Sequence, residues 1–130
     1  MDLPAVHRLL PPPRAVAWAI HHVPACTSTQ ELAARALERG ERAGFVICTD
    51  YQGEGRGRHG ATWVAARGSA LLFSLLLEPG HAMLPLTPLL SGVAVVDGIR
   101  AACGLQAELE WPNDVMVADR KLAGILVRHP

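Results

Sequence analysis

The chain has little of several residue types that would place it in common protein classes. Its 130 residues include three cysteines, carry no formal net charge and are 5% aromatic. Cys26, Cys48 and Cys103 are odd in number and scattered, so they form neither a disulfide framework nor a zinc motif. Balanced charge argues against a broad nucleic-acid-binding surface, which needs an excess of basic residues. The few aromatic residues also do not interleave with the basic ones, as they would at such a surface.

The chain also lacks a long hydrophobic run. The apolar run over residues 70–77 is too short to cross a bilayer, which takes about 20 apolar residues. The first residues lack the basic stretch and apolar core of a secretory signal. The six histidines, His21 and His22 among them, do not form a convincing metal site. We therefore expect a cytoplasmic protein with no membrane partner, no nucleic-acid partner and no metal of its own.

Hydrophobic patterning predicts one α+β domain over residues 15–130, preceded by an irregular proline-rich lead-in over residues 1–14. Capping and apolar spacing predict a helix over residues 30–39, with Ala33, Ala34, Ala36 and Leu37 inward, and a second helix over 86–103 that ends at Gly104. Short apolar runs predict strands at residues 15–20, 44–50, 70–78, 107–111, 115–117 and 122–128. We expect one mixed or antiparallel sheet with helices packed on one side.

The most informative segment is the loop over residues 53–60, in which glycine alternates with Arg56 and Arg58. We expect neither a helix nor a stable strand there. Glycine lets backbone N–H groups curl toward an anion, and arginine adds forked donors that suit carboxylate or phosphate. The loop directly follows a predicted strand, a frequent position for function. An arginine-rich loop that closes over an anion is the interpretation we favour.

Other interpretations of the loop stay open. Gly55, Gly57 and Gly60 match a dinucleotide-binding fingerprint, with Glu78 about 20 residues on. That fingerprint needs a helix to open at the last glycine, whereas the sequence at residues 67–69 would stop a helix after two turns. A Walker-type loop is set aside, because no Lys-Ser or Lys-Thr follows the glycines. The plainest alternative is a solvated hairpin tip.

Further motifs accompany the loop in a fixed order. They are the sequences Thr27-Ser28-Thr29-Gln30, then Gln52, the loop and Trp63, then Trp111-Pro112-Asn113-Asp114, and finally Lys121-Leu122-Ala123-Gly124-Ile125. In this order and spacing, over residues 15–128, the chain resembles the biotin protein ligases. It looks like the front part of their catalytic domain. The resemblance implies an incomplete version of their fold, which is related to that of the class II aminoacyl-tRNA synthetases.

The resemblance implies a two-step reaction. A biotin ligase joins the biotin carboxylate to AMP from ATP, releases pyrophosphate, and then passes biotin to a lysine on a carrier protein. The implied substrates are biotin and ATP, with Mg²⁺ accompanying ATP. The implied protein partner is the biotin carboxyl carrier protein of acetyl-CoA carboxylase. Two anions meet in the first step, so the site must supply positive charge.

The resemblance also implies roles for individual residues. The catalytic cations would be Arg56, Arg58 and Lys121. The residues expected to bind biotin are Ser28, Thr29, Gln30, Gln52, Arg56, Gly57, Arg58 and Lys121. Those expected beside the nucleotide are Gly55, Trp63, Asn113 and Asp114.

Residue types alone leave plainer interpretations open for several of these positions. Ser28 or Thr29 can cap the first helix. Trp63 can bury itself at the root of the hairpin. Asn113 and Asp114 can form an Asx-type turn after the preceding proline.

The chain departs from the family pattern at two residues and in length. Glu110 stands where the family usually has lysine, and Arg128 stands where it commonly has an acidic residue. The family's catalytic domain continues beyond the length of this chain, so we expect a truncated, weak or inactive ligase. A remnant that only binds ligand is one alternative. A lipoate or octanoate ligase is another, although its acyl pocket would favour apolar residues at positions 28–30.

Overall fold

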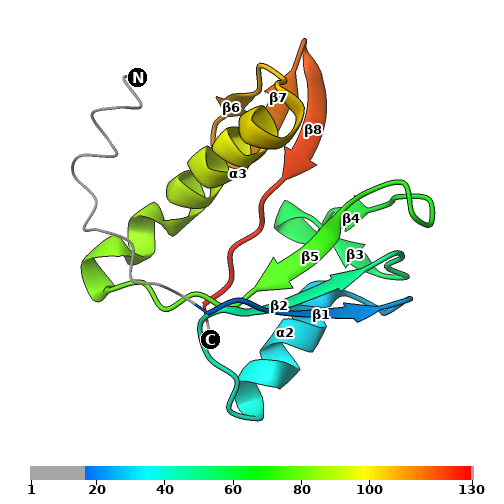
Figure 1. The fold of residues 1–130 in the computed structure, drawn as a ribbon, viewed down its shortest axis with the longest axis vertical. Coiled ribbons are helices and arrows are strands. Elements are labelled where there is room, and N and C mark those ends of the chain that lie inside the picture. The colour runs from blue at the N-terminus through cyan, green and yellow to red at the C-terminus, as the bar shows by residue number, and fades with distance from the viewer. Residues whose placement is uncertain (1–16, 130) are drawn as a thin grey trace.

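The computed structural model describes residues 17–129 (Figure 1). The predicted lead-in, and the first two residues of the first predicted strand, lie outside the described residues. The secondary structure alternates short strands with two longer helices and so confirms the α+β class. The elements, in order, are β1 (Ala19–Val23), α2 (Thr29–Glu38), β2 (Phe45–Thr49), β3 (Gly55–Arg56), the 3-10 helix η1 (Arg58–Gly60), β4 (Thr62–Trp63), β5 (Leu72–Leu75), the 3-10 helix η2 (His81–Leu86), α3 (Thr87–Cys103), β6 (Glu108–Glu110), β7 (Asp114–Val117) and β8 (Arg120–Gly124).

The first half of the described chain is a mixed sheet of three strands with one helix. β2 pairs in parallel with β1 and antiparallel with β5, and α2 packs against β2 and β5. Ala33 and Ala36 are buried on the sheet side of α2, together with Ile47 and Leu72 of the sheet. Ala34 is exposed, contrary to the prediction, because one residue turns the helix by about 100° away from the buried row.

The second half is an antiparallel sheet, β6-β7-β8, covered by α3. Its core is formed by Val96, Ala107 and the fully buried Val115. Gly92 lets Leu109 approach α3, since a Cβ there would lie 2.5 Å from Leu109 Cδ1. The helix ends as predicted at Gly104, which adopts the left-handed conformation with φ of 67°.

The prediction of one continuous sheet was wrong for the described residues. Their strands form two three-stranded sheets and the separate hairpin β3-β4. Tight turns explain the division, because β6, β7 and β8 follow one another closely and pair among themselves. The turn before β8 lies at Ala118 and Asp119, both with positive φ, so β8 begins earlier and ends earlier than the predicted strand.

The segment His81–Cys103 is long and apolar enough to cross a membrane by length and composition. Within this segment, 17% of the most apolar 18-residue stretch is buried in the described structure. A single helix of this kind is weak evidence for a membrane span, because the core helix of a soluble protein meets the same criterion. In the described structure α3 packs against β6 and β7.

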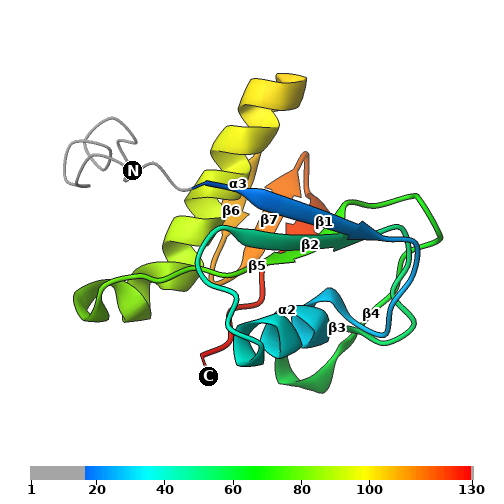
Figure 2. The same ribbon diagram turned by 60° about the horizontal axis from the view of Figure 1, so that its bottom comes forward.

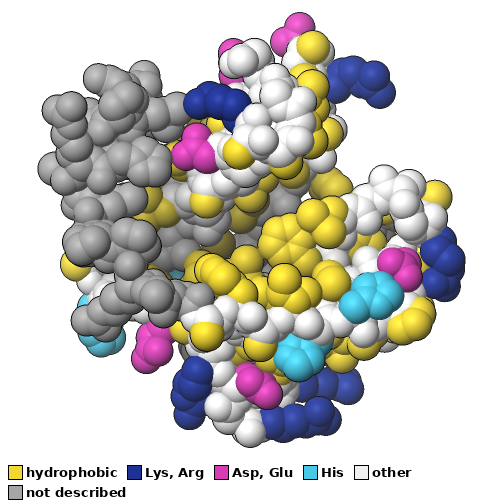
Figure 3. Space-filling view, viewed as in Figure 1, with side chains coloured by type: hydrophobic (Ala, Val, Ile, Leu, Met, Phe, Trp, Pro, Cys, Tyr) yellow, Lys and Arg dark blue, Asp and Glu magenta, His cyan; other side chains and the backbone are white. Residues whose placement is uncertain are grey.

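The two halves face each other across a hollow. Figures 1 and 2 show the two sheets as separate layers, with the segment after β8 running back toward α2. Hydrophobic side chains gather along this hollow in the space-filling view (Figure 3). The hairpin β3-β4 lies between the halves, so the predicted anion-binding loop is placed where they meet.

Candidate functional site

The glycine-arginine loop forms a short hairpin. β3 pairs with β4, Gly55 opposite Trp63, and η1 makes the turn between them. The sequence predicts neither a helix nor a stable strand in this segment; the structure has only the two-residue strand β3 and the short 3-10 turn η1 there. A Cβ on Gly55 would lie 2.4 Å from the Trp63 backbone oxygen, so only glycine permits this pairing. A strand follows Gly60 instead of a helix, and this excludes the dinucleotide fingerprint.

Gln52 ties the loop to the start of α2. Its carboxamide oxygen accepts hydrogen bonds from the Thr29 backbone N–H at 2.7 Å and the Thr29 hydroxyl at 3.0 Å. The same hydroxyl lies 2.9 Å from the Ser74 hydroxyl on β5. Among the described residues these bonds use only the oxygen of Gln52, so its amide N–H groups can still serve a ligand.

The interpretation of Ser28 or Thr29 as a side chain that caps the helix was wrong, because neither side chain makes the capping hydrogen bond. Ser28 is the N-cap residue with an extended backbone, but its side chain makes no capping hydrogen bond. Gln52 satisfies the first helical N–H instead, from another segment of the chain. Ser28 and Thr29 are buried, at 3% and 4% exposed, and the Thr29 hydroxyl lies beside Gln52. Sequence reasoning missed Ser74, whose signal was a single polar residue within the apolar run of β5.

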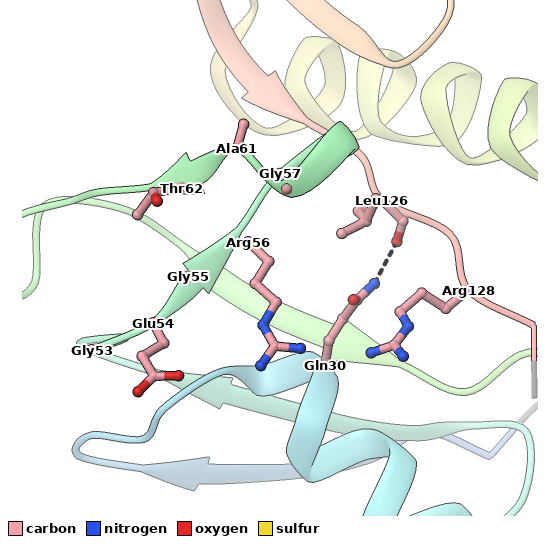
Figure 4. A pocket seen from close by; sticks show the side chains of 11 residues that line it. Gln30, Gly53, Glu54, Gly55, Arg56, Gly57, Ala61, Thr62, Leu126 and Arg128 are labelled. Carbon is pink, nitrogen blue, oxygen red and sulfur yellow. Dashed lines mark hydrogen bonds between the residues drawn. The ribbon is translucent and has the colours of Figure 1, made fainter.

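Gln30 projects from the first turn of α2 into a hollow beside the loop. The hollow has a volume of about 560 Å³ and is lined by Gln30, residues 53–57 and 60–62, Leu126 and Arg128 (Figure 4). The Gln30 amide nitrogen donates to the Leu126 backbone oxygen at 2.8 Å. Its carboxamide oxygen is buried and has no hydrogen-bond partner among the described residues.

Thr27, the first residue of the same motif, does not line this hollow. Its hydroxyl donates to Glu31 at 2.9 Å, and Arg35 donates to the same carboxylate at 2.6 Å. These two hydrogen bonds, with a smaller contribution from the charge of Arg56, hold the pKa of the Glu31 carboxyl below its ordinary value. Glu31 therefore stays ionised and paired at neutral pH.

Lys121 on β8 links the second half to the hairpin. Its ammonium lies 2.9 Å from Asp114 Oδ1 and 5.4 Å from the centre of the Trp63 ring. The contact with Asp114 is an ion pair, and Asp114 Oδ1 is buried. Trp63 also packs on Gly124, where a Cβ would lie 3.1 Å from the indole. Trp63 therefore packs across to β8.

Arg58 makes a second link between the halves. Its guanidinium donates to the Asn113 side-chain oxygen at 3.1 Å, and the Asn113 backbone oxygen accepts from Ile125 at 2.8 Å. The Asn113 side chain therefore binds the loop rather than its own turn. Two further contacts join the halves: the hydrogen bond from Gln30 to Leu126 and the contact of Lys121 with the Trp63 ring. Each of these contacts involves a residue that the sequence predicted for the site.

Glu110 lies opposite Asp114 in the β6-β7 ladder. Like charges in directly opposed positions are unfavourable, and Asp114 is the partner of Lys121. If the chain binds the adenylate that its resemblance implies, we expect Glu110→Lys to raise the affinity for a non-hydrolysable biotinyl-adenylate analogue by about threefold, because Glu110 is exposed and its charge is screened. Titration calorimetry measures the change. Glu108→Lys is the matched control, since Glu108 lies on the same strand opposite Met116. An equal gain in both variants would contradict a local effect at Asp114.

Comparison with known proteins places this arrangement in a family. A model of the biotin/lipoate A/B protein ligase family matches residues 23–129. The chain belongs to this family. Over 102 residues it is 37% identical to the bifunctional ligase/repressor BirA of Bacillus spizizenii, covering 77% of this chain and 31% of the relative. Over 107 residues it is 34% identical to the biotin–acetyl-CoA-carboxylase ligase of Mycobacterium tuberculosis, covering 77% of this chain and 40% of that protein.

A solved structure agrees with the sequence comparison. The biotin protein ligase from Aquifex aeolicus, in complex with biotin and ATP, superimposes with a TM-score of 0.70 at 34% identity. The match covers 82% of this chain and 45% of that one. The chain thus spans less than half the length of each of these three family members. The predicted family and its fold class are confirmed.

Proposed function

We propose that the chain carries the biotin-activating site of a biotin protein ligase. The activity is ATP-dependent formation of biotinyl-AMP, followed by transfer of biotin to a lysine of a biotin carboxyl carrier protein of acetyl-CoA carboxylase. The observation that carries the proposal is the pocket at the hairpin, which Arg56 lines together with Gln30, while Arg58 and Lys121 pair with the adjacent residues Asn113 and Asp114. Membership of the family supports it.

The proposed chemistry needs position and charge more than covalent help. The biotin carboxylate and the α-phosphate of ATP repel each other, so cations fixed beside both lower the barrier to their reaction. Arg56 has no hydrogen bond or ion pair with another described residue and can hold an oxyanion. Lys121 and Arg58 are held by Asp114 and Asn113, which fix their direction. Magnesium enters with ATP as part of the substrate.

The other end of biotin is a neutral cyclic urea, which calls for small polar partners. The free amide N–H groups of Gln52 can donate to the urea oxygen, and the buried residue Ser28 precedes Thr29, the hydrogen-bond partner of Gln52. The apolar lipoyl ring has no groups that would satisfy these partners. A buried polar group left without a partner is unfavourable, so these residues favour biotin over lipoate.

Transfer of labelled biotin tests the proposed activity. The chain is incubated with biotin, ATP, magnesium and a carrier domain, and labelling of the carrier lysine is measured. Since the chain spans about a third of the Bacillus relative, a second arm joins it to that relative's remaining C-terminal segment. We expect biotin transfer in the joined arm. Absence of transfer in both arms, with folding confirmed, would contradict the proposed activity. We place the reaction in the cytoplasm, where the three free cysteines stay reduced.

The loop over residues 53–60 is expected to gain order when ligand binds. Four glycines make the free loop entropically costly to fix, so ordering depends on contacts between arginine and an anion. Hydrogen exchange with and without the biotinyl-adenylate analogue is expected to slow in this segment, with little change in β2. Unchanged exchange in the loop at confirmed saturation would count against an anion-binding role.

A further inference from the structure

Arg128 shares the hollow of Gln30 with Arg56. In Figure 4 the two guanidinium groups extend toward Gln30 from opposite sides, Arg56 from β3 and Arg128 from the segment after β8. Neither makes a hydrogen bond or ion pair with another residue in the described part of the chain. The resemblance led us to expect an acidic side chain at position 128, so this second cation is a property of this chain.

The acidic groups near these arginines form no ion pair with them, although the charges of Glu31 and Arg56 are close enough to interact. Glu54 lines the same hollow, but its carboxylate points away from Gln30 (Figure 4). Glu31 is engaged by Thr27 and Arg35. Two unpaired guanidinium groups that face one hollow repel each other, and an oxyanion between them would remove this repulsion.

Gln30 supplies a second, independent indication of a ligand. Its carboxamide oxygen is buried in this hollow and lacks a hydrogen-bond donor among the described residues. An orphaned acceptor is unfavourable unless a donor reaches it. The group that fits the hollow therefore combines an oxyanion with a nearby N–H or O–H.

We propose that Arg128 is a specificity-determining residue that, together with Arg56, holds an oxyanion of the substrate in the hollow at Gln30. The proposal rests on the proposed function, which offers two sources of that oxyanion, the carboxylate of biotin and the phosphate of its adenylate. The phosphate has ribose hydroxyls close to it, which could donate to Gln30.

Two pairs of probes test the proposal, each consisting of an anion and a neutral counterpart. Calorimetry compares biotin with biotinamide, and AMP with adenosine, on the unmodified chain and on Arg128→Gln. We expect one of the anions to bind about tenfold more weakly to Arg128→Gln, with its neutral counterpart unchanged, because an exposed guanidinium is partly screened. The pair that responds identifies the source. Arg128→Lys keeps the positive charge but not the two-pronged guanidinium, and we expect it to lose less affinity for that anion than Arg128→Gln does.

The control is Arg39→Gln, which removes an exposed arginine at the opposite end of α2 from Gln30. It is expected to leave all four affinities unchanged. If Arg128→Gln weakens neither anion, or weakens both members of a pair equally, the assignment is overturned while biotin binding by the unmodified chain still supports the proposed function. If the unmodified chain binds none of the four probes, the proposed function fails and this assignment fails with it.

Discussion

Gly55→Ala is expected to weaken biotin binding by about five- to hundredfold. The added Cβ would lie 2.4 Å from the Trp63 backbone oxygen and 3.0 Å from the Gln52 amide nitrogen. The first contact is with backbone, which cannot move aside without parting β3 from β4. Overpacking of this kind costs about 1–3 kcal/mol, and each 1.4 kcal/mol is a factor of about ten in affinity. Titration calorimetry with biotin measures the loss.

Gly98→Ala is the control for this prediction. A Cβ there meets no atom within 4 Å, and the residue lies on α3, outside the hairpin and the lining of the hollow. We expect it to bind biotin as the unmodified chain does. Circular dichroism establishes that both variants are folded. Equal affinity in the two variants would show that the hairpin geometry does not hold the binding site.

Lys121→Met is expected to weaken binding of the biotinyl-adenylate analogue by about ten- to hundredfold. A hydrogen bond to a charged group contributes about 1.5–3 kcal/mol, and methionine keeps the packing volume while removing the charge. The Lys121 and Asp114 side chains are 43% and 26% exposed, which weakens their ion pair, but Asp114 Oδ1 is itself buried, so Lys121→Met also lowers stability. Thermal unfolding measures that loss separately, and affinities are compared at a temperature where both proteins are folded.

A double variant separates two explanations for that loss. If Lys121 acts only by pairing with Asp114, then Asp114→Asn in the Lys121→Met background removes the orphaned charge and restores binding. If Lys121 contacts the ligand, the double variant stays weak. We expect it to stay weak. Restored affinity would make Lys121 a structural residue.

The sequence predicted the elements of this fold better than their assembly. Periodicity located α2 and α3 to within a residue, and Gly104 marked the end of α3, because these are local signals. Pairing of strands depends on contacts distant in sequence. The division into separate sheets followed from turns such as the one at Ala118 and Asp119. Both residues have positive φ, and the sequence has no glycine there to indicate it.

The candidate site shows the same limit. The order of the motifs pointed to Gln30, Gln52, Arg56 and Lys121. In the structure Gln30 and Arg56 line one hollow, Gln52 binds Thr29, and Lys121 lies over Trp63 of the hairpin. It did not reveal that Gln52 satisfies the start of α2, since that bond joins residues 23 apart. Ser74 and Arg128 enter the site only through folding, from a strand and from the segment after β8.

The most direct measurement of the central claim is calorimetry of the folded chain with biotin and with lipoate. Both are acids, so the arginines do not distinguish them, and discrimination depends on the polar groups around Gln52 and Ser28. The account predicts that biotin binds and that lipoate binds at least about tenfold more weakly, because its ring would leave these groups without partners. Equal or tighter binding of lipoate would contradict it.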